Sequence, residues 1–390
     1  MKKKLVILGS TGSIGSTTLS SIKNIPEFEI KCLSTNRNIK KLYSQAKLFK
    51  VKNVIVEKKN IYLKYKDFFK KKKIKLHYGI HNIDKIIKKK VDYCINSLSG
   101  IDGLEPTLKI IPRTKNILIA NKESIICGWH LIKKKLNKHN TKFIPIDSEH
   151  YSIMKLIQGE NIESIDKIIL TASGGPFLNK SKKQIVNISP KEAINHPNWK
   201  MGKKISIDSS NMMNKIYEYI EAKKIFNLSN SKLSILIHPN SYVHAIINLK
   251  GGLIKFLAHD TNMRIPILKA LGIKKKTENI FSNKSLKSFN NLKFKKPTTK
   301  QFPLLNILNI IPNRTSYFET ILITLNDSLV KKYLNKDINY ISIQKNLLNF
   351  IKKPYLKKYY KLKPNSIYDI KKMILITNAI LRENLKIYEK

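Results

Sequence analysis

The first part of the chain alternates short apolar runs with stretches of helical periodicity. This alternation is typical of βαβ units, which build a parallel sheet with helices on its faces. We therefore expect an α/β, Rossmann-type domain over residues 1–147, with the Lys-rich pieces Lys70–Lys75 and Lys85–Lys90 as solvated helix ends and loops. The predicted strands are Lys4–Gly9, Glu29–Ser34, Asn53–Glu57, Asp92–Asn96, Asn116–Ala120 and Lys142–Ile146.

The pattern changes after Asp147, where apolar strands are interrupted by long polar segments. We expect an α+β domain over residues 148–272, a polar linker over 273–300 and a small helical domain over 301–390. The strands predicted for the second domain are Lys167–Thr171, Leu233–His238, Ala245–Leu249 and Leu253–Leu257. The helices predicted for the third are Tyr317–Leu334, Ile341–Lys352 and Ile367–Leu385.

The net charge of +49 would ordinarily indicate a nucleic-acid or membrane partner. Almost all of this charge is Lys, spread over the whole length together with Asn, Ile and Tyr, a set that AT-rich codons encode. Recognition of bases and phosphates favours Arg, which is rare here. We attribute the charge to compositional bias and expect no specific nucleic-acid partner, with polyanion binding as the alternative.

Cysteine usage and hydropathy indicate the compartment. Cys32, Cys94 and Cys127 are odd in number and far apart, as expected of reduced thiols in a cytosol. The apolar run after the first lysines ends at Gly9, too early for a signal peptide, and no run approaches the ~18 apolar residues of a membrane helix. We expect a soluble, cytoplasmic protein.

A glycine-rich turn, Gly9-Ser-Thr-Gly12-Ser-Ile-Gly15, lies between the first strand and the first helix. In this context the glycines let the backbone approach a dinucleotide pyrophosphate at the helix N-terminus. The end of the second strand carries Arg37 and no acid, which suits the additional phosphate of NADP. The alternative is a glycine turn that binds nothing.

Carboxylates follow the last strand of the first domain and recur on a later helix. Asp147 and Glu149 follow the strand, where alternate residues would share a face. Asn214, Glu218 and Glu221 have spacings of four and three on a helix predicted to begin at Ser209, so they line one face. Such a hard-oxygen set prefers magnesium or manganese to zinc, although surface acids are common without any metal.

Further donors and a possible lid lie nearby in the sequence. Ser173 with Gly174 and Gly175 offers a hydroxyl and amides to a phosphate, and Ser209, Asn214 and Lys215 add more. The stretch from His196 to Gly202 contains Trp199 and Met201 and has the composition of a closing flap. The alternative reading of Trp199 is a buried aromatic that anchors an ordinary loop.

Together these segments resemble the 1-deoxy-D-xylulose 5-phosphate reductoisomerase family. The resemblance covers roughly the first two-thirds of the chain, in the order of the family's motifs. The matching strings are GSTGSIG, GLEPTL, ANKES, PIDSEH, LTASGGPF, HPNWKMGKKISIDS, MMNK, IHPNSYVH and MRIPI. Departures are Asn195 for Arg, Ile216 for Gly, Thr261-Asn262 for Pro-Asp, and Leu325-Asn326-Asp327 for a longer Asn-rich string.

The resemblance implies a V-shaped homodimer with an NADPH domain, a central catalytic domain and a C-terminal helical domain. It implies that Asp147, Glu149 and Glu218 hold a divalent metal (magnesium, manganese or cobalt), with Glu221 beside them. It assigns catalytic roles to Lys122, Asp147, Glu149, Glu218 and His196. The implied substrate-binding residues are Ser148, Glu149, Ser173, His196, Trp199, Ser209, Asn214, Lys215, Glu218, Ser241 and Lys122. His196, Trp199 and Met201 belong to the implied closing flap. The implied cofactor-binding residues are Thr11, Gly12, Ser13, Ile14, Arg37, Asn38, Asn121, Lys122, Glu123 and Gly202.

The activity implied is rearrangement and NADPH-dependent reduction of 1-deoxy-D-xylulose 5-phosphate to 2-C-methyl-D-erythritol 4-phosphate, a step of non-mevalonate isoprenoid biosynthesis. Two alternatives stay open from the sequence. One is another NADP-dependent oxidoreductase acting on a phosphorylated sugar. The other is a decayed enzyme that binds polyanions.

Overall fold

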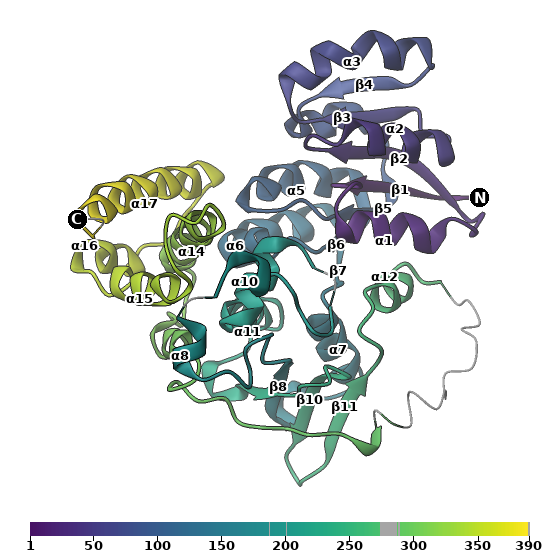
Figure 1. Cartoon of the computed structure of the whole chain (residues 1–390). Helices are drawn as coiled ribbons and strands as arrows, with labels where there is room; N and C mark the ends of the chain where they lie inside the picture. Colours follow the sequence, from purple (N-terminus) through teal and green to yellow (C-terminus); the bar gives the residue numbers. More distant parts are fainter. Residues whose placement is uncertain (187, 200, 274–286, 288, 389–390) are drawn as a thin grey trace. The chain divides into compact units, whose positions relative to one another are not determined.

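The computed structural model describes residues 1–186, 188–199, 201–273, 287 and 289–388. The chain divides into two compact units. The first consists of Met1–Tyr151 and Met263–Lys275, and the second of Ser152–Asn262 and Lys276–Lys390. Figure 1 shows the elements of both units along the chain.

The first unit contains a seven-stranded sheet in which every neighbouring pair is parallel, with the order β4-β3-β2-β1-β5-β6-β7. The order reverses between β1 and β5, so the carboxyl ends of these two strands form the crevice where such sheets bind ligands. The predicted parallel sheet is therefore confirmed. The strands are β1 (Lys3–Leu8), β2 (Phe28–Thr35), β3 (Asn53–Val56), β4 (Lys75–Tyr78), β5 (Val91–Asn96), β6 (Thr114–Ile119) and β7 (Lys142–Pro145).

One strand of this sheet, β4, was not predicted from the sequence. β4 begins at Lys75, at the end of a Lys-rich piece that we expected to be a solvated loop or helix end. It pairs only with β3 and forms the edge of the sheet. An edge strand has a solvated side, so its polar residues concealed the apolar pattern that marks the central strands.

Helices connect the strands of the first unit: α1 (Ser13–Ile22), α2 (Ile39–Leu48), α3 (Lys59–Lys71), α4 (Ile83–Ile86), α5 (Leu104–Ile110) and α6 (Lys122–His139). A later helix, α12 (Arg264–Ala270), also belongs to this unit. Ile267 and Leu271 are fully buried in the same apolar core as Leu5 and Leu33. The chain thus returns to the first unit within residues that the sequence pattern assigned to the 148–272 domain.

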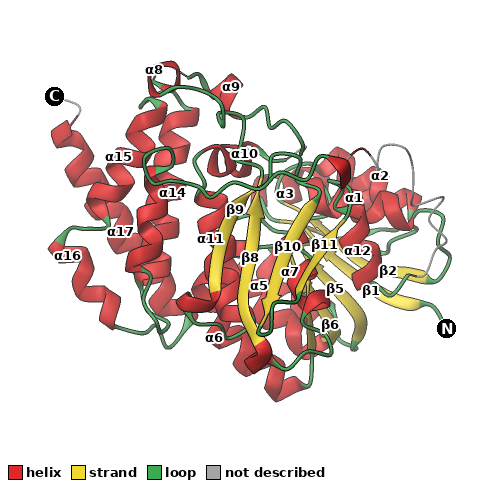
Figure 2. Ribbon diagram, turned by 90° about the horizontal axis from the view of Figure 1, so that it is seen from below, coloured by secondary structure: helices red, strands yellow, loops and turns green. Residues whose placement is uncertain are grey.

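The second unit contains a four-stranded sheet with the order β11-β10-β8-β9. β8 and β9 are parallel, whereas β10 is antiparallel to both of its neighbours. Figure 2 shows these four strands side by side. They are β8 (Ile165–Ala172), β9 (Leu233–Ile237), β10 (Val243–Leu249) and β11 (Ile254–Ala258), which agrees with the strands predicted for this region. The helix α7 (Ser148–Leu156) begins in the first unit and ends in the second.

Helices make up the rest of the second unit. α11 packs against β8 and β9, and α14 packs against α10, α15 and α17. The predicted C-terminal helical region is confirmed, with α14, α15 and α17 within a few residues of the expected bounds. The helices are α8 (Lys182–Ile185), α9 (Pro190–Ala193), α10 (Lys203–Ser210), α11 (Met213–Ile225), α14 (Phe318–Leu334), α15 (Tyr340–Phe350), α16 (Pro354–Lys357) and α17 (Ile367–Tyr388).

Of the linker predicted over 273–300, residues 274–286 and 288 lie outside the described part of the chain. The following residues are held against the second unit. Ile237 and Lys295 exchange backbone hydrogen bonds, and the His238 ring stacks on Phe294 at 4.8 Å between centroids. Among the described helices, none is both long enough and apolar enough to cross a membrane.

Candidate active site

The glycine-rich turn after β1 is closed by backbone contacts that exclude side chains. Gly9 has φ +83°, and a Cβ there would lie 2.6 Å from the carbonyl oxygen of Ser97, at the end of β5. A Cβ on Gly15, in α1, would lie 2.5 Å from the Gly9 oxygen. These positions therefore require glycine. Gly12 caps α1, so Ser13 and Ile14 form its first turn, where free amides can face an anion.

The end of β2 lies beside this turn, as a dinucleotide site requires. The Thr11 and Thr35 hydroxyl oxygens are 2.6 Å apart, and Lys41 donates to the Thr11 carbonyl oxygen at 3.0 Å. Arg37 is exposed, as is Asn38, whose side chain caps α2 by accepting from the Lys41 amide at 3.1 Å. Thr11, Arg37 and Asn38 are thus brought to one end of the sheet.

A second loop at the same end of the sheet is fixed by Asn121. Its side-chain amide donates to the carbonyl oxygens of Leu98 and Gly100, both at 2.8 Å, and its Oδ1 caps α6 by accepting from the Ser124 amide. Glu123 accepts a 3.1 Å hydrogen bond from the same amide group. The buried Asn121 thus ties the segment after β5 to the start of α6, where Lys122 lies.

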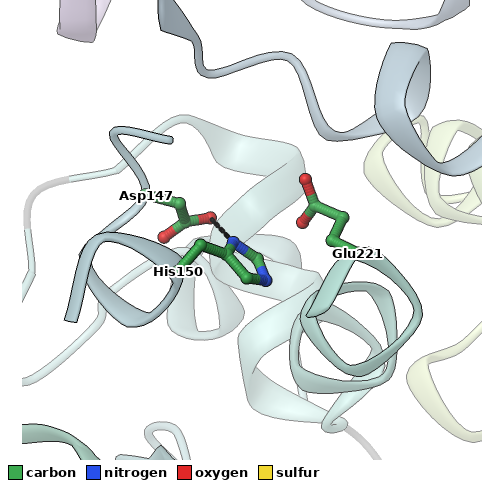
Figure 3. A group of neighbouring side chains, drawn as sticks. All are labelled: Asp147, His150 and Glu221. Atoms are coloured by element: carbon green, nitrogen blue, oxygen red, sulfur yellow. Dashed lines mark ion pairs between the residues drawn. The ribbon is translucent and has the colours of Figure 1, made fainter. Parts of the chain in front are cut away.

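Asp147 and Glu149 follow β7, but the geometry differs from the expectation. Asp147 lies in a bend and Glu149 in the first turn of α7, so the two are not alternate residues of one strand. Lys122 forms an ion pair with Asp147, and the His150 Nδ1 lies 4.0 Å from the Asp147 Oδ2 (Figure 3). Ser148 donates to the Glu149 carboxylate at 2.6 Å. The first unit therefore presents two carboxylates, an imidazole and an ammonium from adjacent positions.

In the second unit, α11 carries the carboxylates of Glu218 and Glu221. We expected one helix from Ser209, but Met212 adopts φ +69° and separates α10 from α11. Within α11, Lys215 forms an ion pair with Glu218, and Asn214 donates to the other Glu218 oxygen at 2.6 Å. Glu218 is 2% exposed, and Glu221 (also drawn in Figure 3) is 1% exposed. Asn214 and Glu218, which we expected on one helix face with Glu221, are therefore in contact.

The donor set fits a hard divalent cation. Asp147, Glu149 and Glu218 offer carboxylate oxygens, the ligands that magnesium and manganese prefer. Buried carboxylates are costly without positive charge, and here two of the three are paired with lysine ammonium groups. The chemistry of these donors is therefore compatible with a divalent cation.

Ser173 and His196 meet in the second unit. Ser173 follows β8, and its hydroxyl lies 2.9 Å from the His196 Nε2. The His196 Nδ1 accepts from the amides of Asn198 and Trp199, at 3.1 and 3.0 Å, so Nε2 carries the proton and donates to Ser173. Burial lowers the pKa of His196 to about 4. The ring is therefore neutral at physiological pH.

The rest of the predicted flap is anchored through Asn198. Its side-chain amide donates to the carbonyl oxygen of Pro239 at 2.6 Å and to the Ser241 hydroxyl at 3.0 Å. The Trp199 ring is half-buried and meets the His244 ring edge-on at 6.0 Å. Met201 is half-buried and Gly202 caps α10. Hydrogen bonds of the segment from His196 to Trp199 thus connect it to Ser241 through the Asn198 side chain.

The Ser173 loop lies directly on α10. Gly174 and Gly175 have φ +83° and +71°, and a Cβ on Gly175 would lie 2.8 Å from the Ser209 carbonyl oxygen and 2.7 Å from the Ser210 Cα. This close approach brings Ser173 next to Ser209. Of the predicted phosphate-binding residues, Ser173 and Ser209 are thereby placed on adjoining segments.

Two residues of the site were not singled out from the sequence. His150 is the last residue of the PIDSEH motif, and the sequence analysis gave it no role. It approaches Asp147 because the two residues are three apart at the start of a helix, whereas a strand would not bring them together. Asn198 belongs to the predicted flap segment, but the sequence analysis gave it no role. Its role depends on the fold of residues 239–241, far along the chain, so no local signal could reveal it.

Three family models match the chain. They are 1-deoxy-D-xylulose 5-phosphate reductoisomerase (residues 5–128), its C-terminal domain (143–226) and the DXP reductoisomerase C-terminal domain (259–377). The reductoisomerase of Pelagibacter ubique is 49% identical over 374 residues, which cover 95% of this chain and 96% of that protein.

Solved structures agree with the sequence matches. A DOX-P reductoisomerase in complex with NADPH, fosmidomycin and magnesium has a TM-score of 0.91 and 30% identity, covering 100% of this chain and 99% of its own. The Zymomonas mobilis enzyme in complex with NADPH has a TM-score of 0.86 and 28% identity, covering 98% and 99%. From its family models, its relatives and its fold, the chain belongs to the 1-deoxy-D-xylulose 5-phosphate reductoisomerase family.

Proposed function

We propose that the residues described above carry out the family's reaction. The chain is an NADP-dependent oxidoreductase that converts 1-deoxy-D-xylulose 5-phosphate to 2-C-methyl-D-erythritol 4-phosphate. The observation that carries the residue assignment is the carboxylate set Asp147, Glu149 and Glu218, with lysines paired to two of its members. This set favours the rearranging enzyme over a simple oxidoreductase, which needs no divalent metal.

Asp147, Glu149 and Glu218 would hold the divalent metal, with magnesium or manganese favoured by the oxygen donors. A metal held there would supply polarisation of the substrate's carbonyl and hydroxyl oxygens, and bound NADPH would supply the hydride. Lys122, already paired with Asp147, would contact the same substrate oxygens. Ser148, whose hydroxyl lies against Glu149, would bind a sugar hydroxyl.

The substrate phosphate would bind in the second unit. Ser173 and Ser209 lie on adjoining segments, and Asn214 and Lys215 lie on α11. The neutral His196 can donate to the Ser173 oxygen, which frees the Ser173 hydroxyl hydrogen for a phosphate oxygen. Trp199 and Met201 would cover the substrate and exclude water, while Ser241 would bind a hydroxyl.

NADPH would bind at the carboxyl ends of β1 and β2 in the first unit. The pyrophosphate would face Thr11, Gly12, Ser13 and Ile14 at the α1 N-terminus. The exposed Arg37 and Asn38 would contact the 2′-phosphate. Asn121, Lys122, Glu123 and Gly202 complete the proposed set.

We infer a homodimer formed through β11. This strand is an edge of its sheet, and Ile254 and Phe256 on it are 60% and 44% exposed, next to Leu253 at 57%. An exposed apolar edge strand is prone to pair with another strand, and a second copy of the chain can provide that strand through a symmetric interface.

The buried free thiols of Cys32, Cys94 and Cys127 support a cytoplasmic location.

The reaction is tested by NADPH absorbance loss with 1-deoxy-D-xylulose 5-phosphate, with magnesium or manganese present and then with a chelator. Oxidation that requires both substrate and metal is the expected result. Oxidation that continues in excess chelator would refute the metal site. A folded protein that binds NADPH but oxidises none would support the reading as a decayed enzyme.

A further inference from the structure

The residues on both sides of Ser209 are held by helices from the C-terminal region. Asp208 and Ser210 flank Ser209 near the end of α10 and are 1% and 2% exposed. Asp208 is bonded to α14, and Ser210 is bonded to Tyr340 at the start of α15. Ser209 itself is only half-buried. A half-buried hydroxyl thus lies between two buried neighbours with fixed partners.

The Asp208 carboxylate has both of its oxygens occupied. Oδ1 accepts from the Asn326 side-chain amide at 2.8 Å, and Oδ2 accepts from Lys204 at 2.8 Å. A carboxylate only accepts hydrogen bonds, so the Asn326 amide nitrogen must face it. Lys204 also lies 3.0 Å from Asp327, the next residue of α14, and 5.1 Å from the centroid of the Tyr217 ring.

On the other side, the Ser210 hydroxyl oxygen lies 2.8 Å from the Tyr340 hydroxyl oxygen. Ser210 donates its own hydrogen to the Ile207 carbonyl oxygen at 2.7 Å, so Tyr340 is the donor in the contact between them. Burial raises the pKa of Tyr340, which keeps the phenol protonated and able to donate. The Tyr340 ring is fixed in turn by Phe177 and Tyr333, at 5.3 and 5.8 Å between centroids.

We propose that Asn326 and Tyr340 are positioning residues for phosphate binding: they clamp Asp208 and Ser210 and so aim the Ser209 hydroxyl. This inference rests on the proposed role of Ser209 in the phosphate site. It gives the C-terminal helices a part in substrate affinity although both side chains are buried. A buried hydrogen bond on each side restricts rotation of α10, which a single contact would not.

The chain offers a matched pair of variants. Tyr340→Phe removes the hydroxyl bonded to Ser210 and keeps the ring. Tyr333→Phe removes a comparable buried hydroxyl, whose partner is the Ile188 carbonyl oxygen at 2.9 Å and not a residue of α10. Both tyrosines are 1% exposed, so the two variants should lose similar thermal stability. Only Tyr340→Phe should affect the phosphate site.

For Tyr340→Phe we expect the KM for 1-deoxy-D-xylulose 5-phosphate to rise about five-fold, with kcat and the KM for NADPH nearly unchanged. Asn326→Leu, which removes the other donor and keeps the volume, should act in the same direction. Tyr333→Phe should leave all three constants near wild type. An equal substrate KM in Tyr340→Phe and Tyr333→Phe would overturn the clamp.

Ser209→Ala separates failure of the clamp from failure of the phosphate site. If Ser209→Ala raises the substrate KM and Tyr340→Phe does not, the phosphate site stands and the clamp is wrong. If Ser209→Ala leaves the substrate KM unchanged, Ser209 is not a phosphate ligand, and the clamp falls with that assignment. A rise in both variants supports both proposals.

Discussion

At the scale of single residues, the chemistry depends on which groups are charged. Glu218 and Asp147 are each paired with a lysine, which offsets the negative charge of these two carboxylates. His196 is uncharged because burial disfavours its protonated form. The residue types were predictable from the sequence. Lys215 and Glu218 are three residues apart on one helix. The pairing of Lys122 with Asp147 was not predictable, because the fold brings these two residues together and their spacing does not.

The neutral state of His196 gives a prediction about pH. With a pKa of about 4 in the folded chain against 6.5 as its ordinary value, the folded state binds fewer protons than the unfolded state between these values. The contribution of His196 to stability is therefore complete above pH 6.5 and is lost as the pH falls towards 4. An NMR titration of the His196 ring should show a midpoint near 4. A midpoint near the ordinary value would contradict the buried, Ser173-bonded ring.

The exposed Arg37 at the end of β2 gives a prediction about cofactor choice. Arg37→Asp should shift preference towards NADH, because it removes the cation proposed to meet the 2′-phosphate and adds a carboxylate suited to ribose hydroxyls. The ratio of kcat/KM for NADPH and NADH measures the shift. Lys41→Ala is a control for general loss of positive charge beside the turn. An unchanged ratio in Arg37→Asp would remove Arg37 from the cofactor site.

At the scale of elements, the local sequence pattern predicted the central strands well. It failed where contacts with residues distant in the sequence determine the backbone conformation. β4 was missed because an edge strand has a solvated side. Asp147 and Glu149 were predicted as an extended pair, but Asp147 lies in a bend and Glu149 in the first turn of α7. The break between α10 and α11 at Met212 was also missed, since a left-handed Met has no sequence signal. Each failure lies where packing against distant residues sets the backbone.

The contact of the Ser173 loop with α10 gives a prediction at this scale. Gly175→Ala would place a Cβ against the backbone of Ser209 and Ser210, whereas Gly252→Ala, at φ +90°, would meet nothing within 4 Å. Both variants should lose roughly 1 kcal/mol of unfolding free energy from backbone strain. Gly175→Ala should lose a further ~1–3 kcal/mol from overpacking and should raise the substrate KM. Denaturant unfolding and steady-state kinetics measure the two effects, and equal losses would contradict the close contact.

At the scale of the whole molecule, the sequence motifs identified the family, and the family implied the domains. The compact units differ from the pattern-based bounds because α12 returns to the first unit after the second sheet is complete. Such a return cannot be read from periodicity, since an apolar helix looks the same in either core.

The inferred homodimer is tested at the edge strand β11. Ile254→Lys should give a monomer in light scattering, because a charge on the edge strand opposes pairing with a second copy. Leu375→Lys is the matched control: Leu375, on α17, is 70% exposed, against 60% for Ile254, and its replacement should leave the dimer intact. A wild-type chain that is monomeric at micromolar concentration, or an Ile254→Lys variant that stays dimeric, would rule out this interface.

Our main proposal is that Asp147, Glu149 and Glu218 hold the catalytic metal. The most direct measurement compares wild type and Glu218→Gln in magnesium-dependent NADPH oxidation with 1-deoxy-D-xylulose 5-phosphate, together with NADPH affinity. We expect turnover to fall at least about a thousand-fold, because the metal's several kcal/mol of stabilisation is lost. NADPH affinity should stay near wild type, since Glu218 lies outside the cofactor unit. Near-normal turnover, or a parallel loss of NADPH affinity, would contradict the claim.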